Sequence, residues 1–500
     1  MGSIVQTIAF QGVDVLKINV EVQITGGLVA FPIVGLPDKA VAESRERIRG
    51  ALQSIGLGIP SRRIIVNLSP AAVQKEGTHY DLPMALGLLE VMGILPKNRL
   101  EGYYVMGELG LNGSIQSVPG ILPAAITAFQ DGKSLICPYE GAQEATWVEG
   151  LQVIGVPTLM SLLNFLDGKQ MLTPPQGLFQ PRPKKEKDWS DIRGQKLTKR
   201  ALEIAAAGGH NVLMIGSPGT GKSMLAERFS TILPPLSPNE ALEISMIYSL
   251  SGLLSEGRLL YERPFRAPHH SASLPALVGG GIRAKPGEVT LAHRGVLFLD
   301  ELPEFARNTL ESLRQPLESR QVVVARANNH CTYPASFQLI AAMNPCPCGY
   351  LGDTRRWCAK APQCGQHYIK KLSGPLLDRI DLHMDVPSVS LSDLDNQKDE
   401  ESSAVVAKRV LAARAYQHKR GGDVKEFTNS DIPAASVEAL CCLTAEAKSL
   451  LQKAFEKFNL SLRSCHRIIR VSRTIADLEG EGSVGPHHMS EALGLRCRGL

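Results

Sequence analysis

A glycine-rich octapeptide between an apolar run and a helix-forming run is the clearest chemical signal in the sequence. It has the spacing G-x-x-x-x-G-K-S, and its residues are Gly216, Ser217, Pro218, Gly219, Thr220, Gly221, Lys222 and Ser223. In such a loop, backbone N–H groups and the following helix N-terminus bind phosphates, the lysine reaches the β- and γ-phosphates, and the serine can bind Mg²⁺. The octapeptide predicts an ATP and Mg²⁺ site; the alternative is a glycine turn without a ligand.

Polar side chains end two further apolar runs. Residues 296–299 are followed by Asp300 and Glu301, and residues 339–343 by Asn344. We expect Asp300 to hold Mg²⁺ through water and Glu301 to polarise the attacking water. Asn344 is expected to orient that water or to sense the γ-phosphate. The alternative is that these are ordinary residues at strand ends.

Four cysteines follow Asn344 closely. They are Cys346, Cys348, Cys358 and Cys364, separated by one, nine and five residues. Four thiolates satisfy the tetrahedral preference of Zn²⁺, although the spacing is not a repeated C-x₂-C pair. His367 is a further candidate, in place of one of the cysteines. A structural Zn²⁺ and a cluster of reduced thiols therefore both remain open.

The elements that must position these residues follow from the apolar patterns. Short β-rich runs alternate with helical segments between 194 and 386, which predicts a parallel sheet. Before the proline-rich stretch 174–187, strands at 16–22 and 64–68 and helices at 39–55 and 82–92 predict a mixed α and β region. After residue 402, helices are expected at 405–418, 445–458 and 464–478.

Length and composition agree with several soluble domains. The chain has 500 residues, 44% hydrophobic and 21% charged, with a net charge of +5. That charge is too small to identify a nucleic-acid ligand, and no apolar run has the roughly 20 residues of a membrane span. With no export signal, we expect a cytoplasmic protein without a membrane partner, whose ten cysteines are thiols or metal ligands rather than disulfides.

Longer motifs around the phosphate loop resemble one family. The stretches 263–273, 286–288, 291–295 and 373–382 are similar to the YifB/ComM family of magnesium-chelatase-like AAA+ ATPases, over essentially the whole chain. The resemblance implies an α/β AAA+ P-loop NTPase core at 190–398, an all-α C-terminal lid at 399–500, and a homo-hexameric ring that moves branched DNA. It also implies that Arg379 is an arginine finger for the neighbouring subunit and that Arg463 is a second sensor. A salt bridge from Arg379 to Asp378 or Asp381 is the alternative.

Two segments of the core are candidates for DNA contact. By the same resemblance, 277–285 is a mobile loop of an insert, and 321–330 reads as a strand running into a hairpin tip that faces the channel of a ring. Arg283, Lys285 and Arg326 would bind phosphates there without reading bases. The alternative is that all three are solvated loop charges. In the cysteine cluster, Lys360 stands where the family usually has its last cysteine.

The N-terminal region, 1–172, resembles the Lon-protease-like α+β domain of ribosomal S5 type, followed by a linker at 173–189. Met84 stands where a Lon-like protease has its serine, and methionine cannot act as that nucleophile. Three functions therefore compete: a ring-forming DNA motor for branch migration in recombination or transformation, a magnesium-chelatase ATPase subunit, and a protein-remodelling unfoldase. We favour the DNA motor.

Overall fold

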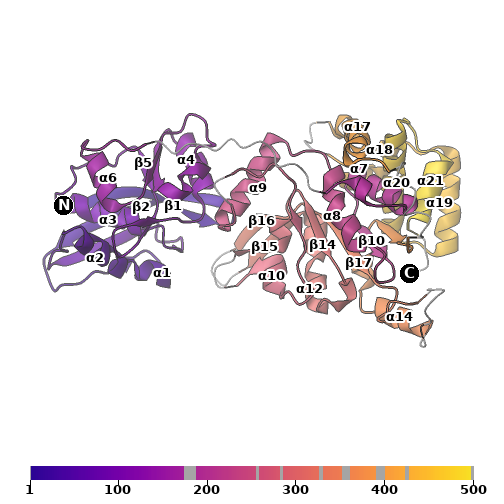
Figure 1. Cartoon of the computed structure of the whole chain (residues 1–500), viewed down its shortest axis with the longest axis horizontal. Coiled ribbons are helices and arrows are strands. Elements are labelled where there is room, and N and C mark those ends of the chain that lie inside the picture. Colours follow the sequence, from indigo (N-terminus) through magenta and orange to yellow (C-terminus); the bar gives the residue numbers. More distant parts are fainter. Residues whose placement is uncertain are drawn as a thin grey trace.

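The computed structural model describes residues 2–173, 187–254, 258–281, 285–325, 330–351, 358, 361–389, 400–422 and 427–496. The N-terminal elements form one end of the molecule, and the C-terminal helices form the other (Figure 1). Among the residues described, no helix is both long enough and apolar enough to cross a membrane. The proline-rich stretch 174–186 and the expected DNA contacts Arg283 and Arg326 lie outside the described residues.

The N-terminal region is built on a mixed seven-stranded sheet. Its strand order is β3 (Ile33–Val34), β4 (Arg63–Ser69), β2 (Asp14–Thr25), β1 (Gly2–Gln11), β5 (Tyr103–Val105), β8 (Ser134–Pro138) and β9 (Val153–Val156). The pairs β1–β2 and β2–β4 are antiparallel, and the other pairs are parallel. A small separate sheet joins β6 (Glu108–Leu109) to β7 (Ile115–Gln116). The expected strands 16–22 and 64–68 therefore fall within β2 and β4.

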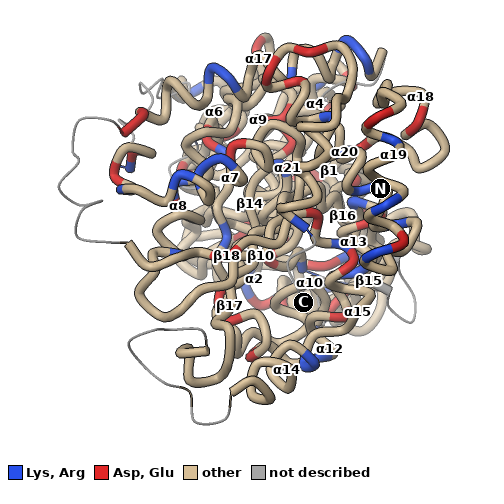
Figure 2. The backbone as a smooth tube through the Cα atoms, turned by 90° about the vertical axis from the view of Figure 1, so that its right-hand side faces the viewer, with Lys and Arg blue, Asp and Glu red and all other residues tan. Residues whose placement is uncertain are grey.

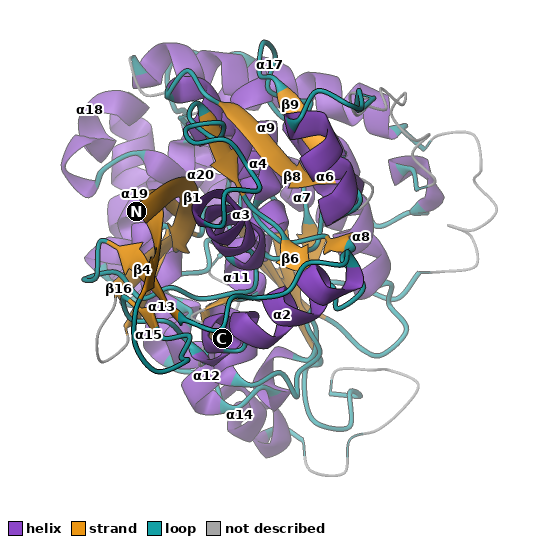
Figure 3. Cartoon of the chain, turned by 90° about the vertical axis from the view of Figure 1, so that its left-hand side faces the viewer, coloured by secondary structure: helices purple, strands orange, loops and turns teal. Residues whose placement is uncertain are grey.

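Helices cover this sheet, and one of them is buried almost throughout. They are α1 (Lys39–Ala42), α2 (Ser44–Ser54), α3 (Asp81–Val91), α4 (Ile121–Gln130), α5 (Ala142–Ala145) and α6 (Leu159–Leu166). The expected helix 39–55 is divided at Glu43, which ends α1 and precedes α2. Helix α3 packs on β1 and β2 (Figure 3). Met84 is fully buried on α3, so it contributes to the hydrophobic core of this region.

A five-stranded parallel sheet forms the middle of the molecule, as the alternating pattern predicts. Its order is β11 (Phe265–Arg266), β14 (Val296–Leu299), β17 (Gln338–Met343), β10 (Val212–Ile215) and β18 (Leu382–Asp385). All residues of β14 and β17 are buried, because helices cover both faces of a parallel sheet. These helices include α7 (Lys196–Gly208), α8 (Lys222–Ile232), α9 (Pro238–Leu250), α11 (Glu288–Leu291), α12 (Arg307–Ser312), α13 (Arg314–Ser319), α14 (Gln363–Ile369) and α15 (Gly374–Leu377).

Two small hairpins project beside this sheet. After α10 (Leu274–Val278), strand β12 (Gly279–Gly280) pairs antiparallel with β13 (Lys285–Pro286), and β15 (Gln321–Ala325) pairs with β16 (His330–Pro334). The two hairpins are neighbours, since β12 contacts β15. The expected loop 277–285 therefore contains the end of α10, strand β12 and the first residue of β13, while 282–284 lie outside the described residues. Strands β15 and β16 pair as the two arms of a hairpin, and the expected tip at 326–329 also lies outside the described residues.

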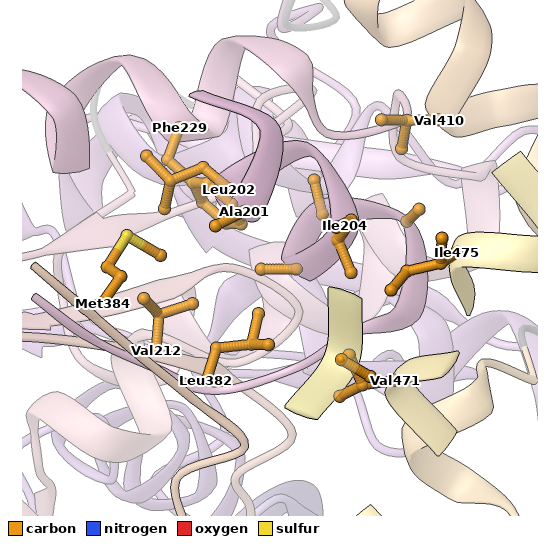
Figure 4. Packing of buried hydrophobic residues seen from close by; sticks show 14 of the residues in the cluster. Ala201, Leu202, Ile204, Val212, Phe229, Leu382, Met384, Val410, Val471 and Ile475 are labelled. Carbon is orange, nitrogen blue, oxygen red and sulfur yellow. The ribbon is translucent and has the colours of Figure 1, made fainter. Parts of the chain in front are cut away.

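The C-terminal residues form helices, in agreement with the sequence pattern. They are α17 (Ser403–Gly421), α18 (Val437–Cys441), α19 (Ala445–Phe458), α20 (Leu462–Glu479) and α21 (Pro486–Gly494). Acidic and basic residues are interspersed over this end of the molecule (Figure 2). The apolar sides of α17 and α20 pack on α7, so that Val410, Val471 and Ile475 share one hydrophobic cluster with Ile204 and Val212 (Figure 4).

Helix α9 carries a direct contact between the N-terminal region and the central sheet region. The backbone carbonyl of Ser249 accepts a hydrogen bond from the Gly120 amide at 3.0 Å. The Ser249 hydroxyl donates to Glu144 Oε2 at 2.5 Å and accepts from the Leu122 amide at 3.3 Å. Burial raises the pKa of Glu144, and the Ser249 hydroxyl acts against that shift.

Candidate functional site

The glycine-rich loop runs from the end of β10 to the first turn of α8. Gly219 and Gly221 have φ values of 80° and 86°, a left-handed conformation that side chains disfavour. Gly216 has no room for a side chain, because an added Cβ would lie 2.6 Å from the Val386 carbonyl oxygen. The glycines are therefore needed for this path, which ends with Gly221 at the N-terminus of α8. The amide groups there provide an anion-binding end.

Lys222 begins α8 and folds back over the loop. Its side-chain Nζ donates to the carbonyl oxygens of Gly216 at 2.7 Å and Ser217 at 3.0 Å. It also donates to Asn344 Oδ1 at 3.2 Å. Burial lowers the pKa of Lys222, while Asp300 and Glu301 oppose this shift. The structure thus brings Lys222 and Asn344 into direct contact.

Ser223 and Asp300 also meet at this edge. The Ser223 hydroxyl donates to Asp300 Oδ2 at 2.9 Å. Asp300 follows β14 and Asn344 follows β17, and β17 lies between β14 and β10. Because these strands are parallel, the residues after their carboxyl ends converge beside the phosphate loop. A hydroxyl and a carboxylate oxygen are donors that suit Mg²⁺, so this pair fits the ion expected from the sequence.

Glu301 lies next to this pair and has a partner that the sequence did not predict. Its φ is 51°, and its amide donates to Asp300 Oδ1 at 2.9 Å. Its Oε2 lies 3.2 Å from Nδ1 of His270, which follows β11 on the far side of β14. The stretch containing His270 contributed to the family resemblance, but no spacing rule connects it with Glu301.

A cavity of about 560 Å³ lies beside the phosphate loop. It is lined by Gln195, Leu197, Met384, Pro387 and Leu495, among others. Gln195 links the cavity to the loop, because its Nε2 donates to the Thr220 carbonyl oxygen at 2.7 Å. The sequence analysis missed this residue, which precedes α7 and adopts a left-handed conformation with φ of 49°.

Arg379 and Arg463 lie at the opposite edge of the sheet. Arg379 accepts a hydrogen bond at its carbonyl oxygen from the side chain of Asn211, which precedes β10, whereas the phosphate loop follows β10. Glu318 Oε1 binds both cations, at 2.7 Å from Arg379 Nη2 and 3.2 Å from Arg463 Nη2. The alternative partner Asp381 instead pairs with Arg467. Neither arginine therefore contacts the phosphate loop of its own chain.

The four cysteines after Asn344 come together. The sulfur atoms of Cys346, Cys348 and Cys358 all lie within 4.8 Å of one another. Cys364, on α14, has its sulfur 3.1 Å from that of Cys358. Cys346 and Cys358 are buried, and Cys348 is exposed. Of the three predicted DNA contacts, Lys285 alone belongs to the described residues, where it is exposed on β13.

Comparison with known proteins accounts for nearly the whole chain. The family model of magnesium chelatase, subunit ChlI, matches residues 188–394, with further ChlI models matching 20–141 and the C-terminal residues 400–496. The competence protein ComM of Haemophilus influenzae is 43% identical over 501 residues, covering 99% of this chain and 97% of the relative. The chain belongs to the YifB/ComM family.

Other relatives place this family near the magnesium chelatases. YifB of Salmonella typhimurium is 42% identical over 496 residues, covering 99% of this chain and 97% of its own length. The magnesium-chelatase 67 kDa subunit of Chlorobaculum parvum is 28% identical over 162 residues, which are 31% of this chain and 23% of the subunit. The YifB/ComM family is thus one of magnesium-chelatase-like AAA+ ATPases, with a mixed α/β fold, parallel strands and C-terminal helices.

Proposed function

We propose that this protein is an ATP-driven AAA+ motor that works on branched or single-stranded DNA as a homo-hexameric ring, with 190–398 as its ATPase domain and 399–500 as its lid. The observation that carries the proposal is the placement of two groups of polar and charged side chains at opposite ends of the parallel strands, which we call the two edges of the sheet. Lys222, Ser223, Asp300 and Asn344 meet at one edge. Arg379 and Arg463 meet at the other, away from the phosphate loop of their own chain.

Each residue at the first edge has a distinct task in ATP hydrolysis. The loop 216–223 binds the phosphates through its amides, and Lys222 adds a positive charge at the β- and γ-phosphates. Ser223 and Asp300 hold Mg²⁺, which neutralises phosphate charge when it is bound. Glu301 polarises the attacking water, and Asn344 orients it. The cavity beside Gln195 accepts the adenosine group, since it adjoins the loop.

The two arginines give a reason for assembly into a ring. A guanidinium supplied by a neighbour stabilises the charge that develops on the γ-phosphate, an effect worth about 10³ to 10⁵ in kcat in other nucleotide hydrolases. In this chain Glu318 holds Arg379 and Arg463 side by side. We infer that both act in trans, which refines the role of Arg463 expected from the sequence.

DNA is the proposed load of the motor. The designation of the Haemophilus influenzae relative as a competence protein supports it. The neighbouring hairpins β12–β13 and β15–β16 supply the contact surface through Lys285, together with Arg283 and Arg326, which lie outside the described residues. Contacts of this kind bind phosphates without reading sequence and weaken with salt. In this proposal the N-terminal region, 1–172, is a Lon-like domain without proteolytic activity, joined by the linker 173–189.

A mixing experiment tests the ring and its load together. Lys222→Ala and Arg379→Ala proteins are each expected to lose ATP hydrolysis. When the two are mixed, some interfaces combine an intact Lys222 with an intact Arg379, and ATP hydrolysis returns. No recovery in a mixture that forms mixed rings would refute the action in trans. A wild-type ring that hydrolyses ATP but neither binds nor moves forked DNA would refute the DNA load.

The chelatase-type ATPase subunit is a second candidate function. The match of the chelatase family model to residues 188–394 favours it. The same experiment separates the two functions, because a chelatase subunit would hydrolyse ATP but would neither bind nor move forked DNA.

A further inference from the structure

The sulfur cluster after β17 has the dimensions of a metal site. Neighbouring sulfurs are 3.1 Å apart for Cys346 and Cys348, 3.4 Å for Cys348 and Cys358, and 3.1 Å for Cys358 and Cys364. Four thiolates at about 2.3 Å from a tetrahedral Zn²⁺ would be about 3.8 Å from one another. Cys364 contacts Cys358 but lies outside the group of three sulfurs that are all within 4.8 Å of one another. To admit the ion, neighbouring sulfurs must therefore move slightly apart, and the Cys364 sulfur must move toward Cys346 and Cys348.

A tight backbone turn follows the first cysteine of the cluster. The Gly349 amide donates to the Cys346 carbonyl oxygen at 2.9 Å, which closes the turn. The turn needs Gly349, because its φ of 82° is a left-handed conformation that side chains disfavour. The Cys346 sulfur lies within 4.8 Å of those of Cys348 and Cys358, so this turn helps to bring the three sulfurs together.

The cluster is attached to the phosphate loop on one side. An added Cβ on Gly349 would lie 2.5 Å from Cδ of Pro218, so the turn after Cys348 packs directly on the loop. Cys346 is also only two residues beyond Asn344, which contacts Lys222 at 3.2 Å. Movement of this cysteine-containing turn would therefore shift both Pro218 and Asn344.

On its other side, the cluster is attached to α14 through Cys364. Tyr368 of α14 is buried in the hydrophobic cluster under the central sheet. Lys371, just after the helix, pairs with Glu304 at 3.1 Å. The element that carries Cys364 is thus fixed to the core, and it offers a firm support for a metal ligand.

We propose that Cys346, Cys348, Cys358 and Cys364 bind one structural Zn²⁺, which fixes the turn at Gly349 against Pro218 and so sets the nucleotide affinity of the phosphate loop. Binding converts four thiols to thiolates and releases their protons to solvent, with no change in oxidation state. The metal site stands on its own geometry, whereas its effect on nucleotide binding rests on the proposed ATPase function.

The metal content of the full-length protein tests the first part of the proposal, the binding of Zn²⁺ by the four cysteines. We expect about one zinc per chain by mass spectrometry of the metal, released when a mercurial reagent blocks the thiols of the wild type. Cys348→Ser combined with Cys358→Ser should lower the content to background. Cys442→Ser, a change at another exposed cysteine, is the matched control and should keep the zinc. Zinc-free wild type, or disulfides among these four cysteines, would overturn the proposal.

Nucleotide affinity tests the second part of the proposal, the effect of Zn²⁺ on the phosphate loop. Titration with a fluorescent ATP analogue should give a Kd about tenfold weaker after zinc release, which corresponds to about 1.4 kcal/mol. Restoring zinc under reducing conditions should restore the Kd. An unchanged Kd in a protein that has lost its zinc would refute the link to the phosphate loop. A zinc-loaded wild type that binds no nucleotide would instead refute the proposed ATPase function and leave the metal site intact.

Discussion

Replacing Arg467 by methionine should loosen the C-terminal helices from the central sheet. Arg467 lies on α20 and pairs with Asp381, which stands immediately before β18. The two side chains are only 12% and 5% exposed. Arg467 Nη1 also donates to the Arg379 carbonyl oxygen at 3.2 Å, so the same side chain supports the backbone of the proposed arginine finger. Arg467→Met keeps the bulk of the side chain and removes its charge.

The magnitude follows from the burial of the carboxylate. Removing one partner of a buried ion pair costs about 3 to 5 kcal/mol, because the other charge is left uncompensated. Asp381 keeps one hydrogen bond, from the Asn211 amide at 2.8 Å, so we expect about 3 kcal/mol. Burial tends to raise the pKa of Asp381, and Arg467 is the largest opposing influence, which leaves this pKa below its usual value. The carboxylate is therefore ionised at pH 7, and the full cost applies there.

Urea unfolding at pH 7 measures this cost. Fluorescence of Trp189 reports on the right region, because Trp189 belongs to the hydrophobic cluster that joins α20 to the sheet. Asp381→Asn in the Arg467→Met background should recover about 2 kcal/mol, since no charge is then left buried. Arg463→Met is the matched control on the same helix: its pair with Glu318 is half exposed and should contribute less than about 1 kcal/mol. Equal losses for Arg467→Met and Arg463→Met would refute the reasoning.

Three further predictions concern pH, the acid at the site and the contact made by α9. Burial lowers the pKa of three histidines to about 4: His79, His210 and His383. Between about pH 4 and pH 6.5, each is therefore mostly neutral in the folded state and mostly protonated in the unfolded state. The free energy of unfolding should be highest above about pH 6.5 and should fall as the pH is lowered to 4, by up to about 3 kcal/mol per histidine. An unfolding temperature that stays constant over this pH range would contradict this prediction. His270→Ala should lower kcat for ATP about tenfold and leave KM unchanged, because His270 contacts Glu301 and not the phosphate loop; a raised KM alone would contradict its positioning role. Ser249→Ala should cost about 1 to 3 kcal/mol in thermal unfolding, because it removes a hydrogen bond from the partly buried Glu144 carboxylate. A second substitution, Glu144→Gln, should reduce that loss.

The phosphate loop and the residues after β14 and β17 could be found from the sequence because their signals are local. An apolar run of four to six residues followed by glycine, acid or amide marks a buried strand and its carboxyl end. Parallel packing then brings such ends together, as the contacts of Lys222 with Asn344 and of Ser223 with Asp300 show. The cysteines were predictable as a group for a similar reason, since all four lie within one short segment.

The remaining contacts depend on tertiary packing that no periodicity encodes. His270 reaches Glu301 because β11 is the edge strand beside β14. The order of strands in a sheet cannot be predicted from the sequence of either segment alone. Gln195 reaches Thr220 because its own backbone adopts a left-handed conformation. Glutamine seldom adopts this conformation, so the residue type does not predict it. Glu318 binds Arg379 and Arg463 from α13, a short helix that is far from both arginines in the sequence.

The hydrophobic cluster shared by α7, α17 and α20 limits where the chain can be truncated without loss of folding. Cutting the chain near residue 400 would remove Val410, Val471 and Ile475 from their contacts and expose the apolar side of α7 to water. Burial of one such side chain contributes about 1.5 to 3 kcal/mol, so the loss of several exceeds the usual stability margin of a domain. Fragments that end near residue 400 should aggregate, and the roles of the C-terminal helices are better separated by single substitutions in the intact chain.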